Sequence, residues 1–499
     1  MSHGRISSVL RFLSIVATVV GVALFGTGAR LLWVHDHSGQ GMLIHGSADP
    51  AVDPALDRTG DLPVGGAPPL STRAAGAKAS FVAGVSADRR YLVDQHGKPY
   101  LVRADAPWSI LVDLSPADAD GYFALRAQQG FNSAIVSLIG ALKNGGPSDD
   151  GGTYDGVQPF VHGDVTSWNT AYWDRAHAEL RSAAAHGITV FLYPIDGWTI
   201  GHAFTPRDVD QCVDYGRRVA RWAADLPNIV WMTGGDYFSI TNEPADGSDV
   251  DHCMDGMLRG IRSTGDVSPF SIQLGYEKSI STDNPFWRSR VDWSFAYTYY
   301  PTYRAVLESY ARTPVLPTIM GEANYEGPDG HPDTPPTTDQ TLRRQAAWSL
   351  TSGAAGEVYG SKAWDFPDDW RDDVRTRAVT EVNLIRDEVA SLPWWRMVPD
   401  TADRLVTGGR GPEVMDDKPM DVLDNDYVTA ALTPDGKAGL VYVPTARTIT
   451  LDLGALAPGV HATWVDPTDG ARKPVPLSSS LTTPGRNAGG DHDWLLELR

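Results

Sequence analysis

Short apolar runs alternate with amphipathic, helix-like segments through most of the chain between residues 81 and 396. The runs are rich in β-branched and aromatic residues, which is typical of strands buried on both faces. Eight of them can be traced, at Leu101, Ala134, Val190, Val230, Phe270–Leu274, Trp293–Tyr299, Thr318–Met320 and Gly356–Tyr359.

Helix start and stop signals lie between the runs. Ser115 precedes Pro116 and Asp118, which gives an N-cap, a proline in the first turn and an acid near the helix dipole, and Gly130 follows where the helix should end. Thr205 opens a second segment of the same form. Strands and helices that alternate in this way predict the α/β class and a (β/α)8 TIM barrel. An open doubly wound sheet is the main alternative, but no Gly-x-Gly-x-x-Gly turn follows the first strand.

The pattern changes after residue 396. Short alternating runs are separated there by turn sequences such as Pro434-Asp435-Gly436 and Pro467-Thr468-Asp469-Gly470. They predict a small all-β sandwich over residues 397–499 that packs on a barrel domain at residues 81–396.

The N-terminal end carries an uncharged stretch from Phe12 to Ala29, preceded by Arg5 and Arg11. Its length lies between that of a signal peptide and that of a short membrane span, and its positive flank favours the cytoplasmic side. We therefore expect residues 1–35 to be a cleaved signal or a retained anchor, so that the protein is secreted or membrane-anchored facing outward. A buried helix is the third option. Residues 36–80, rich in Ala, Gly, Pro and Asp, predict a disordered linker.

Two of the predicted strands end in a glycine and an acid. The run from Asn228 to Phe238 contains Gly234-Gly235-Asp236, and the run from Pro317 to Gly327 contains Gly321-Glu322. These are the fourth and seventh strands, whose carboxyl ends lie across the mouth of a barrel from each other. Two opposed carboxyl groups are what cleavage of a glycosidic bond needs, one to protonate the leaving oxygen and one to attack or to activate water. For either acid alone, an N-cap or a structural ion pair is an equal alternative.

A second candidate for the acid is Glu243 in the sequence Asn242-Glu243-Pro244, which follows the fourth strand. It lies beyond the predicted strand end in a loop rich in Pro and Asp, where a general acid is harder to hold against the glycosidic oxygen. The long Gly/Asp-rich segment from Gly140 to Ser167 is expected to form a loop or lid over the site.

Charge and composition restrict the classes of molecule that this chain is expected to bind. The net charge of −20, without a Lys/Arg cluster, argues against nucleic acids and acidic polymers and is compatible with a neutral sugar. The 16 Trp and 18 Tyr residues exceed the usual need of a core, and some are expected to stack on sugar rings. The 13 His residues show no metal-ligand spacing, so we expect neither a metal nor another cofactor.

The two cysteines, Cys212 and Cys253, are too few for a disulfide framework or a cysteine zinc cluster. They fall in two predicted neighbouring helices, the second near Asp249–Arg262, close to their mouth-side ends. In an exported protein this placement favours a disulfide, and two buried free thiols are the alternative.

Several short motifs occur in an order that resembles the apiosidase-like glycoside hydrolases, which are barrel enzymes with a small C-terminal β domain. They extend over roughly residues 85 to 470. The matching motifs are Gly97-Lys98-Pro99-Tyr100, Asp105-Ala106-Pro107-Trp108, Gly130-Phe131-Asn132, Ile229-Val230-Trp231 with Gly234-Gly235-Asp236, Gly321-Glu322 with Tyr325-Glu326-Gly327, and Trp394-Trp395.

The resemblance implies a retaining mechanism in which Asp236 is the general acid/base and Glu322 the nucleophile. The chain departs from the family pattern in the fifth strand and after the sixth, where relatives tend to carry histidines and this chain has Ser271–Leu274 and Tyr297–Tyr300. The resemblance therefore does not identify the glycone, which is apiose, another furanoside or a short pyranosyl branch. The side chains expected to line the sugar subsite are Asp105, Trp108, Asp196, Trp198, Tyr237, Tyr297, Tyr299, Asn324, Tyr325 and Trp364.

These features together predict an extracytoplasmic, monomeric glycoside hydrolase that acts on a cell-wall or plant polysaccharide. The alternative is a non-catalytic, envelope-tethered carbohydrate-binding protein, for which stacking aromatic residues alone would suffice. A metal-dependent hydrolase is a third and weaker option.

Overall fold

The computed structural model describes residues 33–35, 41–43, 68–206, 208–236, 245–275, 278–327, 336–413 and 422–499. Residues 1–48 form a unit of their own, in which β1 (Trp33–His35) pairs antiparallel with β2 (Gly41–Leu43). The stretch from Phe12 to Ala29 and most of the predicted linker lie outside the described residues. Within the described ranges, no helix combines the length and the apolar character needed to cross a membrane.

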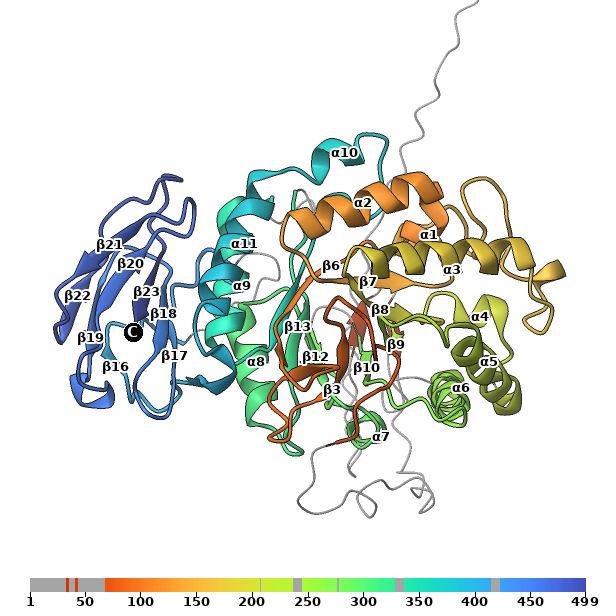
Figure 1. Ribbon diagram of the computed structural model, residues 1–499, viewed down its shortest axis with the longest axis horizontal. Coiled ribbons are helices and arrows are strands. Elements are labelled where there is room, and N and C mark those ends of the chain that lie inside the picture. The colour runs from red at the N-terminus through yellow and green to blue at the C-terminus, as the bar shows by residue number, and fades with distance from the viewer. Residues whose placement is uncertain are drawn as a thin grey trace, which may run out of the picture. The chain divides into compact units, whose positions relative to one another are not determined.

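The larger unit is built around a nearly closed barrel sheet (Figure 1). Eight of its strands run parallel in chain order, and the last of them pairs with the first, Gly356 beside Val102. The predicted TIM barrel is confirmed, and its strands fall where the apolar runs placed them. The strands are β6 (Val102–Asp105), β7 (Ser133–Ser137), β8 (Thr189–Tyr193), β9 (Ile229–Gly234), β10 (Phe270–Gln273), β12 (Ser294–Thr298), β13 (Thr318–Glu322) and β14 (Gly356–Tyr359).

The fifth and sixth barrel strands, β10 and β12, do not form a ladder of backbone hydrogen bonds with each other. A serine side chain connects them. A short strand β11 (Lys278–Ile280) pairs antiparallel with β12. The Ser281 hydroxyl that follows β11 accepts a hydrogen bond from Phe295 N at 2.8 Å and donates one to Ile272 O at 2.6 Å. This hydroxyl therefore satisfies backbone groups of both strands, which water could not reach in a buried seam.

The helices surround the barrel, and one of the two predicted start signals is the observed N-cap. Ser115 caps α2 (Pro116–Gln128) by accepting from Asp118 N, and Gly130 has the positive φ of 94° expected of a helix stop. The start of the next helix, α5 (Val209–Trp222), was predicted too early in the chain. Its N-cap is Asp208, and Thr205 precedes the helix. The other helices are α1 (Ile110–Asp113), α3 (Thr170–Ala185), α4 (Ile200–Ala203), α6 (Ala245–Arg262), α7 (Pro285–Arg288), α8 (Thr302–Ala311), α9 (Asp339–Thr351), α10 (Trp370–Asp373) and α11 (Arg377–Ala390).

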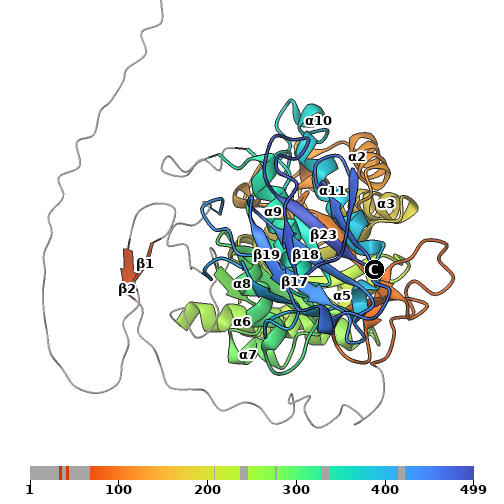
Figure 2. The same ribbon diagram turned by 90° about the vertical axis from the view of Figure 1, so that its left-hand side faces the viewer.

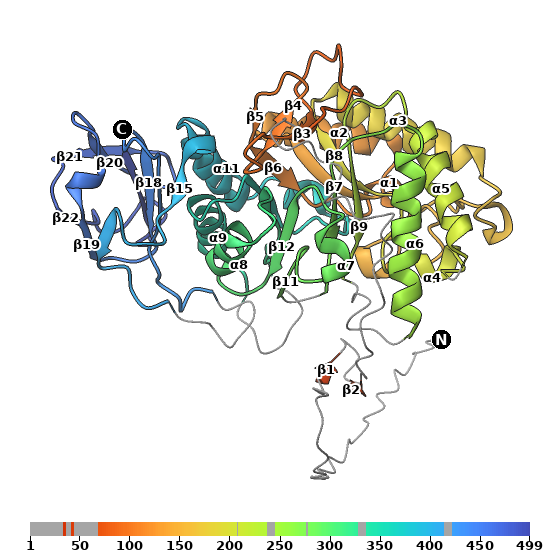
Figure 3. The same cartoon turned by 90° about the horizontal axis from the view of Figure 1, so that it is seen from below.

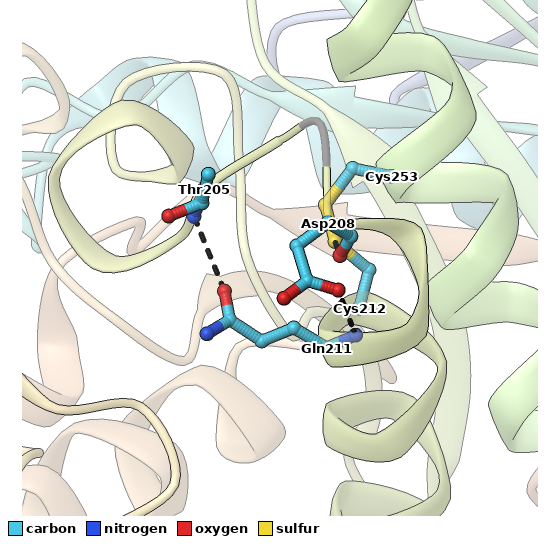
Figure 4. The surroundings of a disulfide bond; sticks show 5 residues. All are labelled: Thr205, Asp208, Gln211, Cys212 and Cys253. Atoms are coloured by element: carbon cyan, nitrogen blue, oxygen red, sulfur yellow. Dashed lines mark hydrogen bonds between the residues drawn. A yellow bond between two sulfur atoms is a disulfide. The ribbon is translucent and has the colours of Figure 1, made fainter.

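A disulfide joins α5 and α6 through Cys212 and Cys253, whose Cα atoms are 5.3 Å apart (Figure 4). Two glycines allow the helices to approach closely. A Cβ on Gly216 would lie 2.0 Å from Met257 O, and one on Gly260 would lie 2.0 Å from Val213 O. The backbones are therefore nearly in contact, and the predicted pairing of the two cysteines is present.

A small antiparallel sheet lies at one end of the barrel and is made of β3 (Val82–Val85), β4 (Leu92–Asp94) and β5 (Pro99–Tyr100) (Figure 3). The Tyr100 hydroxyl donates to Asn132 O at 2.7 Å and attaches this sheet to the start of the barrel strands. Residues ahead of it also pack on the barrel, since Arg73 pairs with Asp266 at 2.6 Å. The packed chain thus reaches back at least to Ser71, whose hydroxyl lies 3.0 Å from that of Ser268, ahead of the expected boundary at Phe81.

Two antiparallel sheets form the C-terminal region and share one core (Figure 2). Arg343 of α9 is fully buried and pairs with Asp493 at 3.0 Å and with Glu381, so an ion cluster joins this region to the barrel helices. Short 3-10 turns occur at Leu142–Asn144, Val161–Gly163, Trp394–Arg396 and Leu453–Ala455. The strands are β15 (Val398–Pro399), β17 (Thr429–Leu432), β18 (Gly439–Val443), β23 (Trp494–Leu498), β20 (Ala462–Val465) and β21 (Arg472–Val475) in one sheet, and β16 (Val406–Gly408), β19 (Thr448–Leu451) and β22 (Ser480–Thr482) in the other.

Candidate active site

Asp236 is presented by an unusual backbone turn after the fourth barrel strand. Gly234 and Gly235 both have a φ of 92°, and Asp236 itself has a φ of 51°. A Cβ on Gly234 would lie 1.9 Å from the carbonyl oxygen of Gln273 on the neighbouring strand. Only glycine fits there, and the strained turn that it permits brings the carboxyl group of Asp236 within hydrogen-bond distance of the Gln273 side chain.

Glu322 is the last residue of β13, the seventh barrel strand, and is 8% exposed. Gly321 before it leaves room for Phe295, because a Cβ at this position would lie 2.3 Å from the Phe295 ring. The strand end is thus packed tightly from the side of β12, which restricts the backbone that carries the carboxylate.

Gln273, at the end of the fifth barrel strand, connects the two acids. Its side-chain nitrogen donates to Asp236 Oδ1 at 3.2 Å and to Glu322 Oε2 at 2.8 Å. The Tyr193 hydroxyl donates to Gln273 Oε1 at 3.0 Å and so fixes which end of the amide faces the carboxyl groups. In the sequence, Gln273 stands out only as part of a departure from the family pattern. The signal that could have found it is its place as a polar residue at the mouth end of an apolar strand.

Two tyrosines from the sixth strand complete the hydrogen bonds of the acids. The Tyr299 hydroxyl donates to Glu322 Oε1 at 3.0 Å. Tyr297 is fully buried and forms hydrogen bonds that lower the pKa of both Asp236 and Glu322. The structure therefore brings the predicted residues Asp236, Glu322, Tyr297 and Tyr299 into one network.

Burial governs the electrostatics of the pair. Desolvation, together with the nearby charge of Asp196, raises the pKa of Asp236 to about 6 against the hydrogen bonds from Tyr297 and Gln273. Desolvation and the charge of Asp236 raise the pKa of Glu322 above its usual range. Two carboxyl groups this close in a buried site cannot both ionise easily, so the pair holds one proton near neutral pH.

Aromatic side chains form a wall beside the pair. The Trp108 indole N–H donates to the Tyr325 hydroxyl at 2.7 Å, and the Tyr325 ring meets Trp364 edge to face with centroids 5.9 Å apart. Trp198 is half-buried, and Lys143 Nζ lies 5.9 Å from its ring centroid. These predicted subsite residues present faces and edges suited to the C–H surfaces of a sugar ring.

Asp196 is fully buried and serves the loops around the site. Its Oδ1 accepts from Trp198 N, Thr199 N and the Thr199 hydroxyl at 2.9–3.0 Å. Its Oδ2 accepts from Ser137 at 2.9 Å and from the side chain of Asn144 at 2.6 Å. Asp196 therefore anchors the segment from Gly140 to Ser167 and orients Trp198.

Two further predicted sugar ligands have their hydrogen-bonding groups engaged by the protein. The Asp105 carboxylate pairs with Arg126 at 2.5 Å and accepts from the Tyr122 hydroxyl. Asn324 Oδ1 accepts from Gln345 of α9 at 2.6 Å. A buried carboxylate or amide must be satisfied internally, and for these two side chains the partners come from helices.

Tyr237 and the rival acid Glu243 lie outside the described residues. Among the residues that the structure does describe, no group of three His, Cys, Asp or Glu side chains is placed to hold a metal ion.

Comparison with known proteins places the barrel in a family. A family model described as Apiosidase-like, catalytic domain, matches residues 86–396. The solved structure of a glycoside hydrolase family 5 protein from Bacteroides vulgatus ATCC 8482 is similar, with a TM-score of 0.69 at 22% identity over 84% of this chain and 93% of that one. A structure described as a glycoside hydrolase gives a TM-score of 0.68 at 20% identity, over 84% and 96% of the two chains.

Both solved structures share the fold with this chain at identities too low to carry more than the fold. No curated protein matches the sequence significantly. The family match covers well over half of the chain and includes both acids of the pair. The chain belongs to the apiosidase-like family and is a glycosidase, with its catalytic domain over residues 86–396.

Proposed function

We propose that this glycosidase cleaves an O-glycosidic bond of a cell-wall or plant polysaccharide with retention of configuration, outside the cytoplasm. Asp236 acts as the general acid/base and Glu322 as the nucleophile. The aromatic wall of Trp108, Tyr325 and Trp364, with Trp198, holds the sugar.

The observation that carries the proposal is the bridge formed by Gln273. The two N–H bonds of a planar amide nitrogen diverge by about 120°. Oxygens held at 3.2 Å and 2.8 Å by that nitrogen are at most about 6 Å apart, and about 5 Å apart when each accepts from its own N–H. Retaining glycosidases have a separation of about 5 to 5.5 Å, whereas inverting ones need about 6.5 Å or more to admit a water molecule.

The chemistry proceeds in two displacements. In the first, the Glu322 carboxylate attacks the anomeric carbon while the bond to the leaving oxygen breaks and that oxygen takes the proton of Asp236. In the second, the Asp236 carboxylate removes a proton from water, the water oxygen bonds to the anomeric carbon and Glu322 is released. Asp236 ends as it began, protonated, and one water is consumed.

The hydrogen bonds favour this division of roles. Among the described residues, Glu322 accepts from three donors, Tyr299 at 3.0 Å, Gln273 at 2.8 Å and Tyr297, whereas Asp236 has two, Tyr297 and the longer bond from Gln273 at 3.2 Å. Donors stabilise the ionised form of a carboxyl group. The negative charge of the pair is therefore best held on Glu322, which leaves the single proton on Asp236.

Two observations support the proposed location. The disulfide between Cys212 and Cys253 is of a kind that persists in oxidising compartments. The uncharged stretch from Phe12 to Ala29 has the composition of an export signal or anchor. The net charge of −20 further favours neutral over acidic polysaccharides as substrates.

The test is hydrolysis of 4-nitrophenyl furanosides and pyranosides of arabinose, apiose, xylose, glucose, galactose and mannose by the full chain, with Glu322→Gln in parallel. We expect release of nitrophenol from one glycone and a loss of at least about a thousandfold in the variant, since the nucleophile is removed. Turnover by Glu322→Gln within tenfold of the parent would overturn the assignment. Binding of glycans with no turnover of any substrate would instead favour the carbohydrate-binding alternative.

A further inference from the structure

A groove of about 430 Å³ lies far from the catalytic pair, where the barrel meets the C-terminal sheets. Tyr310 lies in the last turn of α8, and the turn at Gly353 follows α9. The C-terminal ends of barrel helices lie where the strands begin, so this groove opens on the face opposite the mouth. We call it the basal groove, and the residues that define it are Arg90, Tyr91, Tyr310, Trp394, Trp395 and Val398.

The basal groove gathers exposed aromatic surface. Trp395 is 38% exposed, and it is the one exposed tryptophan among the described residues from 68 onward. Trp394 meets it edge to face at 6.2 Å and meets Tyr91 in the same way at 5.8 Å. Val398, 42% exposed, lines the same groove. A ligand in the groove would cover both of these apolar side chains.

The aromatic rings also offer unused polar groups. The hydroxyls of Tyr91 and Tyr310 and the indole N–H groups of Trp394 and Trp395 have no hydrogen-bond partner within the described ranges. The Arg90 guanidinium stacks on the Tyr310 ring at 3.8 Å, which holds that ring in place. A surface of aromatic faces with donors at their edges matches a sugar, which has C–H faces and hydroxyl edges.

We propose that the basal groove is a second carbohydrate site, which binds a neutral oligosaccharide segment of the polymer that the barrel mouth cleaves. The inference rests on the proposed polysaccharide substrate. The volume of the groove, about 430 Å³, lies in the range of small-ligand pockets. Two sites on one polymer raise its effective concentration at the mouth, so the groove acts on long substrates and not on short ones.

The experiment uses the full chain with Glu322→Gln, so that the polymer is not degraded during electrophoresis. Native gels contain soluble arabinoxylan, arabinan, xyloglucan or galactomannan, and retardation gives the Kd. We expect retardation in at least one gel, and a Kd at least about fivefold weaker when Trp395→Ala is added. Leu453→Ala is the matched control, because Leu453 has the same 38% exposure and, in the 3-10 turn Leu453–Ala455, is not one of the residues that line the groove.

Tyr91→Phe, which removes only a hydroxyl, is expected to weaken retardation less than Trp395→Ala while keeping the fold. Equal retardation with and without Trp395, or no retardation in any gel, would overturn the proposal. Hydrolysis of aryl glycosides by Trp395→Ala in the active chain should stay within twofold, because these substrates reach only the mouth. If the chain hydrolyses aryl glycosides but is not retarded in any gel, only the proposal for the basal groove is refuted. If retardation depends on Trp395 but no substrate is hydrolysed, only the proposed reaction is refuted.

Discussion

Replacing Gln273 by alanine tests the arrangement of the catalytic pair most sharply. A hydrogen bond to an ionised group contributes about 1.5–3 kcal/mol. Only the bond to Glu322 has an ionised acceptor in the reactive form, so we expect a loss of about 2–3 kcal/mol, which is roughly 30- to 150-fold in kcat/KM.

The pH profile supplies a second readout that a general loss of packing would not move. Both hydrogen bonds favour the ionised carboxyl groups, so their removal raises the pKa of each acid. The proposed mechanism needs Glu322 ionised and Asp236 protonated, and both limbs of the profile should therefore shift to higher pH in Gln273→Ala.

The matched control is Tyr193→Phe, which keeps the amide and removes only the hydroxyl that orients it. We expect a loss of less than about tenfold, since a single neutral hydrogen bond contributes about 1 kcal/mol. The assay is hydrolysis of the best aryl glycoside between pH 4 and 9, with thermal unfolding of each variant measured alongside. An unshifted profile together with activity within threefold of the parent in Gln273→Ala would refute the bridging role.

Asp236→Asn should lose less activity on substrates with a good leaving group than on natural glycosides. It should also raise the free energy of unfolding at pH 7 by on the order of 2 kcal/mol. The pKa of Asp236 is about 6 in the folded chain and about 4 in the unfolded chain, so the parent protein loses stability as the pH rises through this range. Gly234→Ala should abolish activity, since its Cβ would clash with the next strand at 1.9 Å, whereas Gly121→Ala, with open space around it, should keep full activity. Arg126→Met should lower the free energy of unfolding in urea by about 3–5 kcal/mol, because the buried Asp105 loses its cation; an unchanged midpoint would count against that ion pair.

The sequence predicted the barrel well because buried strands and amphipathic helices have different periods. The eight strands and the acids at the ends of the fourth and seventh followed from that alternation and from the glycines before Asp236 and Glu322. Helix starts were less certain, since Thr205 and Asp208 are equally good caps and only the folded chain selects the second.

The remaining site residues depend on contacts between distant parts of the chain. Asp105 stands at a strand end and was expected to bind sugar, but its partner Arg126 comes from a helix whose rotation the sequence does not specify. Asn324 lies two residues past Glu322, and its side chain bonds to α9. Gln273 was overlooked for the same reason, because its contact with both acids exists only when three strands are assembled.

The central claim is that two carboxyl groups about 5 Å apart run a double displacement. The most direct test is proton NMR of the sugar released from the best aryl glycoside in the first minutes, before the anomers equilibrate, with Glu322→Gln as the inactive control. The account predicts that the first product has the same anomeric configuration as the substrate and that the variant releases none. A first product of opposite configuration would contradict it, because a single displacement by water would then operate and Glu322 would not be a nucleophile.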